Sequence, residues 1–291
     1  THLKSGATVY YEREKIEGSL YGFIAQRDFE GKLPFSNGGW IELDRKYAGQ
    51  GGDLSWNNKG GKLQSNTQLS YDIASQRDDR KRFINNDGNK GNFSLNQQES
   101  FNSFGIALIQ HLIYGPLTIN GGIRWDANEL KVTDNFLTDG DQTAQRTLNA
   151  WSPQVGLSYT FSPRFSSFVN LSRSYETPTL SELSANPTGS GGFNPFVDIQ
   201  VADNFEGGIH YTSRKTNASL VYFSITTSND LVAYELADSP GRTFYQNAGS
   251  TTRKGIEFLI KHQFNKRFQA QITYNYANFK YQDFEQNGED Y

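Results

Sequence analysis

Residues 117–126 read Leu-Thr-Ile-Asn-Gly-Gly-Ile-Arg-Trp-Asp, so apolar and polar side chains alternate along them. Because successive side chains of a β-strand point to opposite faces, one face of this segment is largely apolar and the other is polar. The same alternation recurs in residues 154–161, 205–211 and 268–277. It predicts antiparallel strands that have one face in an apolar medium and the other in water.

The lengths of the connections distinguish a membrane barrel from a soluble β-sandwich, which also alternates. Along the chain, very short connections alternate with long polar stretches. The short ones are residues 114–116, 162–164, 212–215 and 265–267, and the long ones are residues 76–99, 127–147, 173–203 and 226–246. An up-and-down outer-membrane barrel has tight periplasmic turns and longer outside loops, whereas a Greek-key sandwich does not sort its loops this way. The sequence therefore predicts an all-β fold, a transmembrane antiparallel up-and-down β-barrel.

Composition agrees with a barrel wall and excludes several other classes of protein. Aromatic residues make up 14% of the chain, while hydrophobic residues reach only 35%. This is expected where only every second strand residue faces lipid and aromatics gather at the two interfaces. No apolar run reaches the about 18 residues of a transmembrane helix. The absence of cysteine excludes thiol chemistry, and the net charge of -3 argues against a nucleic-acid partner.

The amino-terminal quarter adds further strand-like segments, and we expect about a dozen strands in all. These segments are residues 5–11, 18–28, 39–46 and 62–74. Residues 283–290 are polar and are expected to form a loop rather than a closing strand. Because open sheet edges in lipid leave costly unpaired backbone groups, we expect residues 1–291 to be a fragment of a larger barrel domain. The absence of methionine agrees with a processed or partial form of a longer protein.

Three segments in the second half of the chain carry recognisable motifs. Residues 170–183 read NLSRSYETPTLSEL, and residues 203–211 read DNFEGGIHY. The third segment contains Asn247-Ala248-Gly249 and, shortly after it, Arg253-Lys254-Gly255-Ile256-Glu257. In this order the segments resemble those of TonB-dependent outer-membrane receptors, in particular the siderophore receptors.

The resemblance implies a fold and a transport function. It implies a barrel of about 22 strands in the bacterial outer membrane, of which residues 1–291 would lack the plug domain and the closing strands. Its partners would be outer-membrane lipid, lipopolysaccharide, a small-molecule ligand and the inner-membrane TonB complex, which would act through a missing amino-terminal region. The expected function is energised uptake of a scarce bulky nutrient with no resident cofactor, and a ferric siderophore is the expected cargo.

Other functions stay open at this point. Cobalamin, haem and oligosaccharides use the same architecture, and a passive porin or another outer-membrane channel is the main alternative. No convincing pair of nucleophile and base is present, so catalytic residues are not expected and the chain is not expected to be an enzyme.

Ligand capture is expected mainly in the long loops, at residues 76–99, 127–147 and 176–200. These combine cations with aromatic side chains, which bind anionic or aromatic ligands. The candidate binding residues are Arg80, Lys81, Arg82, Phe83, Phe93, Phe136, Phe193 and Phe196. Alternatively, residues 77–82 form a solvated loop with internal ion pairs, or their cations bind lipopolysaccharide phosphates, and the aromatics merely pack the loops together.

The polar faces of the predicted strands supply a second set of candidates. The alternation places four charged residues in the barrel lumen, namely Arg124, Asp126, Glu206 and Glu257. In the simpler interpretation these residues hydrate the wall or contact the plug. In the alternative interpretation they contact the substrate. No metal site is expected, because the four histidines are scattered and residues 85–89 lack the spacing of a calcium loop.

Overall fold

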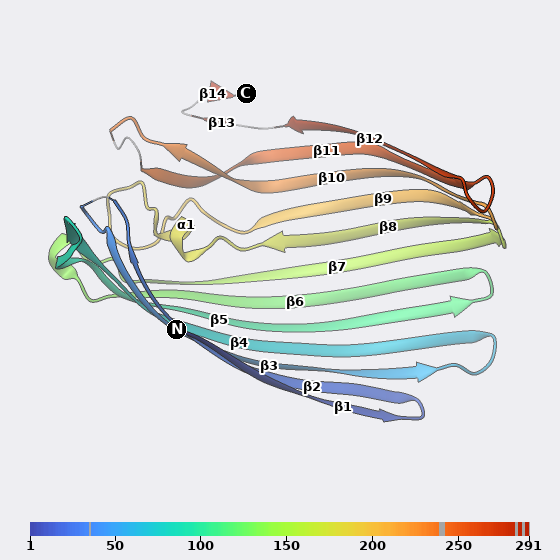
Figure 1. Cartoon of the computed structure of the whole chain (residues 1–291), viewed down its shortest axis with the longest axis horizontal. Helices are drawn as coiled ribbons and strands as arrows, with labels where there is room; N and C mark the ends of the chain where they lie inside the picture. Colours follow the sequence, from blue (N-terminus) through green and yellow to red (C-terminus); the bar gives the residue numbers. More distant parts are fainter. Residues whose placement is uncertain (35, 239–241, 283–284, 287–288, 291) are drawn as a thin grey trace.

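The computed structural model describes residues 1–34, 36–238, 242–282, 285–286 and 289–290, and within them the chain is almost entirely β-strand (Figure 1). Twelve of the described strands form one sheet. They are β1 (His2–Arg13), β2 (Ile16–Lys32), β3 (Trp40–Asn58), β4 (Leu63–Asn86), β5 (Asn89–Tyr114), β6 (Leu117–Asp134), β7 (Ala144–Ser162), β8 (Phe165–Glu176), β9 (Gln200–Thr212), β10 (Thr216–Glu235), β11 (Thr243–Gln263) and β12 (Gln269–Tyr281). The predicted dozen strands are confirmed.

Each strand of the sheet pairs antiparallel with its neighbours in the sequence, in the order β1 to β12. This is the predicted up-and-down topology. Figure 1 shows the consequence for the connections. The short turns at residues 114–116, 162–164 and 265–267 lie at one rim, and the long excursions lie at the other, which confirms the predicted sorting. No described helix is long and apolar enough to cross a membrane.

The register of the sheet separates an outer from an inner face. Directly paired residues in antiparallel strands point their side chains to the same side. Leu69 pairs with Leu108 and Leu108 with Ile123, and these side chains are 50%, 48% and 45% exposed. We call this apolar side the outer face. The apolar residues of the alternating segments, which the sequence places in an apolar medium, belong to it by register; among them are Leu117, Ile119, Ile123, Val155, Leu157, Ile272 and Tyr274.

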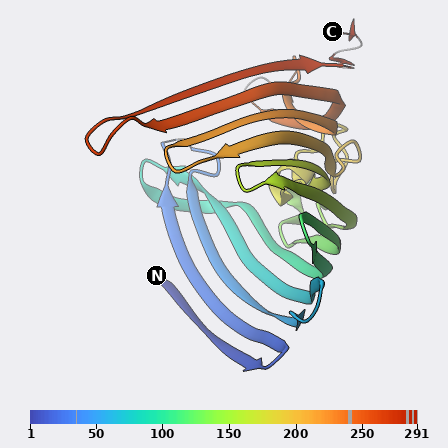
Figure 2. The ribbon, with the colours of Figure 1, turned by 90° about the vertical axis from the view of Figure 1, so that its right-hand side faces the viewer.

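The sheet is curved and remains open. Figure 2 shows the curvature from the side, and the short helix α1 (Leu180–Ser184) lies on the concave side, which is the inner face. Among the described strands, β1 pairs only with β2, and β12 pairs only with β11. The sheet therefore has the shape of part of a barrel wall.

Most of the stretches predicted to be long loops are instead strand. β4 and β5 run through residues 76–99 and meet at a two-residue turn, where Asp87 and Gly88 have φ of 51° and 89°. Residues 127–147 and the described part of 226–246 also belong mainly to strands, joined in the first case by a 3-10 turn, η1 (Leu137–Asp139). The loop prediction was wrong because the outer face of these extensions is largely polar, while apolar side chains such as Leu130 and Val132 are buried on the inner face. The lipid-facing hydrophobic alternation therefore stops there, although the backbone ladder continues.

Two other connections are not extensions of strands in this way. Residues 177–199 form a true loop that contains α1. The loop predicted at residues 283–290 lies partly outside the described residues, because 283–284 and 287–288 are not described. Its remaining residues form a short pair, β13 (Glu285–Gln286) with β14 (Glu289–Asp290).

We predict that Leu157→Arg destabilises the folded barrel, whereas the adjacent substitution Ser158→Arg does not. Leu157 pairs with Ile119 on the outer face. Ser158 pairs with Thr118 on the inner face. An arginine in the lipid-facing wall costs about 2–4 kcal/mol near the bilayer midplane, while an arginine in a wet interior avoids that cost. Urea unfolding of the full-length protein in lipid vesicles measures the difference, and equal stability of the two variants would contradict the assignment of faces.

Candidate ligand-binding site

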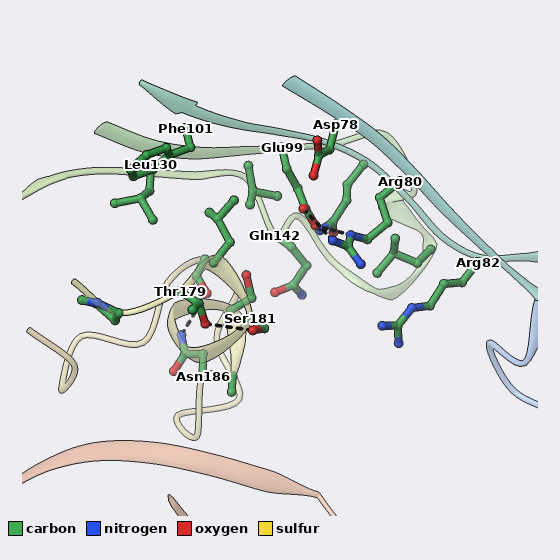
Figure 3. A pocket seen from close by; sticks show the side chains of 18 of the residues that line it. Asp78, Arg80, Arg82, Glu99, Phe101, Leu130, Gln142, Thr179, Ser181 and Asn186 are labelled. Carbon is green, nitrogen blue, oxygen red and sulfur yellow. Dashed lines mark hydrogen bonds and ion pairs between the residues drawn. The ribbon is translucent and has the colours of Figure 1, made fainter. Parts of the chain in front are cut away.

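A cavity of about 1000 Å³ lies on the inner face, near the rim opposite the short turns. One wall consists of the ends of β3 to β6, and residues 177–199 with α1 form the other (Figure 3). Its charged lining residues are Arg45, Asp78, Arg80, Arg82, Glu99, Asp139 and Arg242. The volume is at the upper end of small-molecule sites, which span roughly 300–1000 Å³.

Strand alternation directs three charged side chains of β4 into this cavity. They occupy every second position and are Asp78, Arg80 and Arg82. The intervening residues belong to the outer face and are Arg77, Asp79 and Lys81. The charged run 77–82 is therefore divided between two faces rather than gathered in one loop.

Two ion pairs occupy the strand wall of the cavity. Arg45 Nε and Nη2 donate to Asp78 Oδ1 and Oδ2 at 2.8 and 2.6 Å. Arg80 Nη2 donates to Glu99 Oε2 at 3.1 Å, and its Nε lies 2.7 Å from Oε1 without an aligned hydrogen bond. Asp78 is only 1% exposed. Removing one partner of a buried pair leaves an uncompensated charge at a cost of about 3–5 kcal/mol. These paired charges therefore stabilise the strand wall.

Arg82 lines the same cavity, where its side chain is exposed, and it makes no hydrogen bond or ion pair with any residue that the structure describes. Partial desolvation lowers the pKa of Arg82, and the positive charge of Arg80 lowers it further, against an opposing effect of Glu99. The guanidinium nevertheless stays protonated at neutral pH. A bound anion would supply the missing partner, because planar guanidinium groups bind carboxylates and phosphates through paired hydrogen bonds.

The opposite wall is held in place by a small hydrophobic core. Leu183 and Val197, from the loop, are fully buried against Leu130 of β6 and Leu148 of β7. The loop helix α1 begins with a capping box: the Thr179 amide donates to Glu182 Oε2 at 2.6 Å, and the Glu182 amide donates to Thr179 Oγ1 at 3.3 Å. Residues 177–199 therefore form an ordered wall of the cavity.

Two asparagines link this loop to β11 by hydrogen bonds. Asn194 is fully buried, and its Nδ2 donates to the carbonyl oxygens of Ala185 and Tyr245 at 3.0 and 2.7 Å. Its Oδ1 accepts from the amide of Phe196 at 3.0 Å. Asn247 of β11 donates to the carbonyl oxygen of Asp198 at 3.1 Å. The loop thus bridges β5–β7 and β11 across the concave side of the sheet.

Of the eight binding candidates from the sequence, the structure brings Arg80 and Arg82 together in the cavity. The other six do not line it. Phe83 is buried and stacks on Phe93 with ring centroids 4.6 Å apart, so this pair packs the tip of the β4–β5 hairpin. Phe193 packs against the loop core. Lys81 lies on the outer face, and the remaining two residues, Phe136 and Phe196, lie outside the cavity lining.

The four residues expected in the lumen occupy inner-face positions, away from the cavity lining. Arg124 Nη2 lies 2.8 Å from Asp72 Oδ1 and 2.6 Å from Asp126 Oδ1. Glu206 accepts a long hydrogen bond of 3.5 Å from Asn170 Nδ2. Glu257 follows outward-facing Ile256 and is exposed. These contacts organise the wall, and no cluster suited to a metal ion occurs among the described residues.

The three sequence motifs form structural contacts around the loop. Arg173 of the first motif donates to Asp203 of the second, with Nε–Oδ1 and Nη2–Oδ2 distances of 2.7 and 2.9 Å. β8 ends at Glu176, two residues before Pro178, as expected from the missing amide of proline. A Cβ at Gly255 would clash with the Tyr276 carbonyl oxygen and the Phe223 ring, so the third motif needs glycine there.

Sequence reasoning missed Arg45, Asp78, Arg242 and the asparagine anchors. Arg45 lies in the earlier strand β3, and Arg242 precedes β11. Their convergence depends on the register of the whole sheet and on the path of the loop, which no local pattern encodes. The alternation within residues 77–82 was the one available signal, because it separates Arg80 and Arg82 from Lys81.

Comparison with known proteins places the whole chain in one class. The family described as "TonB dependent receptor-like, beta-barrel" matches residues 2–291. The chain is similar to the ferric citrate transporter FecA, with a TM-score of 0.74 and 16% identity over 96% of this chain and 42% of FecA. It is similar to the copper transporter OprC, with a TM-score of 0.71 and 15% identity over 96% of this chain and 47% of that one.

A third similar structure is the siderophore receptor PiuA from Acinetobacter baumannii, with a TM-score of 0.69 and 13% identity over 100% of this chain and 48% of that one. At such identities the likeness shows the fold alone. The chain spans less than half the length of each of these three proteins.

We predict that Asn194→Ala loosens the loop wall without unfolding the sheet. The substitution removes three buried hydrogen bonds of one side chain, and each unsatisfied partner costs about 1–3 kcal/mol. Hydrogen exchange of residues 177–199 in the full-length protein should accelerate roughly tenfold or more, while exchange in β4 and β5 stays unchanged. The matched control is Asn135→Ala, because Asn135 is exposed and bonds only through its backbone. Unchanged exchange in the loop would contradict the anchoring role.

Proposed function

The chain belongs to the TonB-dependent receptor-like β-barrel family, and from this premise we propose that it forms part of a receptor that binds and takes up an anionic metal chelate, with a ferric siderophore as the leading candidate. The family consists of outer-membrane receptors and transporters rather than enzymes. Family membership favours a receptor over the passive porin that the sequence also allowed.

The unpaired Arg82 in the cavity is the observation that carries this proposal. The other two arginines of β3 and β4 in the cavity are neutralised by Asp78 and Glu99, whereas Arg82 has no partner among the described residues. A second cation, Arg242, lines the cavity and lies over the Phe244 ring, with its Cζ 4.8 Å from the centroid. Ferric chelates with carboxylate or catecholate donors carry negative charge, which these two arginines would attract.

The shape of the site also suits a bulky, polar cargo. The cavity holds about 1000 Å³, and polar and apolar side chains such as Gln97, Gln142 and Leu130 share its lining. Its loop wall is anchored by Asn194 and by the hydrophobic core before any ligand arrives. Such pre-organisation reduces the entropy lost on binding.

The rest of the transport system is proposed by analogy with the family. Among the described strands β1 and β12 each pair along one edge only, which supports a barrel completed by other strands, since open edges are not tolerated in lipid. We propose that residues 1–291 are a piece of that barrel domain. A plug domain and the inner-membrane TonB complex would then supply gating and energy, and the inner-face charges at Arg124, Glu206 and Glu257 would face the plug.

We predict that Arg82→Gln weakens binding of anionic ferric chelates to the full-length receptor by roughly 10- to 100-fold, the usual value of a charge-assisted hydrogen-bonding partner. The matched control is Lys81→Gln, which removes the same charge from the neighbouring position on the outer face and should leave the affinity unchanged. The probes are ferric citrate, a ferric tris-catecholate and a neutral ferric hydroxamate, titrated by intrinsic fluorescence in detergent.

The outcomes separate the alternatives. Loss of affinity in Arg82→Gln for the anionic probes, with the neutral probe unaffected, supports the proposal. Failure of the wild-type receptor to bind either anionic probe saturably, or equal affinities in the two variants, would overturn it. Iron uptake in cells with and without the proton gradient then distinguishes energised transport from passive diffusion.

A further inference from the structure

The two walls of the ligand cavity differ in chemistry. The strand wall carries the two ion pairs and Arg82, whereas none of the residues of the loop wall that line the cavity, within 177–192, is charged. The loop wall presents hydroxyl groups instead, and they belong to Thr177, Thr179, Ser181, Ser184 and Ser190. Guanidinium and hydroxyl groups both donate hydrogen bonds. The two walls together therefore favour a ligand whose surface is rich in acceptor oxygens.

Gln142 stands where the two walls meet. It follows η1 in the connection between β6 and β7, and a Cβ at Gly191 of the loop would clash with the carbonyl oxygen of the preceding residue, Asp141. The backbone amide of Gln142 donates to Asp134 Oδ2 at 3.0 Å, which holds this turn in place.

The side-chain amide of Gln142 is free to bind a ligand. It lines the cavity and makes no hydrogen bond with any residue that the structure describes. In Figure 3 it lies between Glu99 of the strand wall and Ser181 of α1. An amide nitrogen has two donors, and here both are directed at the space between the walls rather than at the protein.

The described lining offers no free aromatic surface. Phe101 is the single aromatic residue among the described lining residues, and its side chain packs against the hydrophobic core of the loop. The guanidinium of Arg242 already lies over the Phe244 ring. Leu130 and Val132 do not replace an aromatic face, because each is only 2% exposed. Ring stacking and cation–π contacts, which hold aromatic ligands, therefore contribute little to this site.

Ferric chelates differ in the surface that they present to such a site. In a tris-catecholate every phenolate oxygen binds the metal, and the outside of the complex displays ring edges with C–H groups. In a polycarboxylate chelate, carboxylate oxygens that do not bind the metal point outward and accept hydrogen bonds. Haem is a third class and takes an axial ligand such as histidine or tyrosine, and neither residue occurs in the described lining.

The charges that remain outside the two ion pairs are Arg82, Arg242 and Asp139. Two are cations and one is an anion, so an acidic ligand is still attracted. A carboxylate fits Arg82 best, because a guanidinium binds it through two parallel hydrogen bonds. Asp139 disfavours a ligand that spreads negative charge over its whole surface, and favours one with a few free carboxylates.

We propose that the ligand is a ferric polycarboxylate chelate, with one free carboxylate on Arg82 and a second free oxygen accepting from the Gln142 amide. This inference rests on the proposed function, and it narrows the anionic chelates to one chemical class. Gln142 is then a specificity-determining residue. A tris-catecholate is disfavoured because its ring edges leave the donors of Arg82 and Gln142 without acceptors.

The test compares two complexes of equal charge and coordination geometry, chromium(III) tris-oxalate and chromium(III) tris-catecholate. Both exchange their ligands slowly, so no free ligand competes for the site. Oxalate leaves carboxylate oxygens on the outer surface, whereas catecholate leaves C–H edges. Calorimetric titration of the full-length receptor in detergent should show that tris-oxalate binds wild type roughly tenfold or more tightly than tris-catecholate.

Gln142→Leu should weaken tris-oxalate binding roughly tenfold, the usual effect of losing a hydrogen bond to a charged acceptor, and leave the tris-catecholate affinity unchanged. Gln142→Glu should weaken tris-oxalate binding further, because it places a carboxylate against the anion. The matched control is Gln145→Leu. The Gln145 amide donates to Glu129 Oε2 at 2.9 Å on the outer face, so this variant should bind both complexes like wild type.

Equal affinity of the wild type for the two complexes, or equal affinities of Gln142→Leu and Gln145→Leu for tris-oxalate, would overturn the proposal. The wild-type comparison needs no variant, so it decides the chemical class even if Gln142→Leu fails to fold. Equal binding of both complexes, weakened in both by Arg82→Gln, would leave the proposed function standing and reject the polycarboxylate class. Failure of both complexes to bind saturably would reject the two proposals together.

Discussion

Continuous antiparallel hydrogen bonding from β1 to β12 is the constraint on which the other features of this structure depend. Lipid offers the backbone no water, so each strand of the wall must pair with its neighbours. Once the register is set, the parity of a residue decides whether its side chain meets lipid or the interior. The charged run at residues 77–82 shows the effect most directly. Arg80 and Arg82 reach the cavity, whereas Arg77 and Lys81 face outward.

The cavity on the inner face adjoins a place where this pairing stops. β7 pairs with β8 only up to the partners Gln154 and Ser172, so among the described strands the rim end of β7 is paired with β6 alone. Residues 177–199 fold over the inner face of that region, where Val197 packs on Leu148. The Arg146 guanidinium donates to the Val197 carbonyl oxygen. The same segment therefore covers the parted strands and forms one wall of the cavity.

The sequence was sufficient for the architecture because the wall has a strict two-residue period in lipid. Strand number, the sorting of the turns and the outward direction of residues such as Leu157 all follow from it. The same reasoning failed at residues 76–99, where the outer face is largely polar and the lipid-facing alternation is lost, although the backbone ladder continues. It also did not distinguish ligand-binding residues from residues that pack the structure. Phe83 and Phe93 lie close to cations in the sequence, as in a binding loop, yet they stack on each other. Asp78 meets Arg45 only through the register of β3 and β4.

A nitroxide scan of β4 in the full-length receptor tests the central claim most directly, because residues 1–291 contain no cysteine that would compete for the label. Each residue from Gln68 to Arg82 is replaced in turn by cysteine, labelled, and measured for collisions with oxygen, which concentrates in lipid, and with a water-soluble nickel complex. The account predicts a two-residue period, with Leu69, Tyr71 and Ile73 most accessible to oxygen. It also predicts that inner-face positions such as Asp72 and Arg82 are accessible mainly to nickel. A profile without this period, or with its phase reversed, would contradict the assignment of faces, and with it the placement of Arg82 in the cavity.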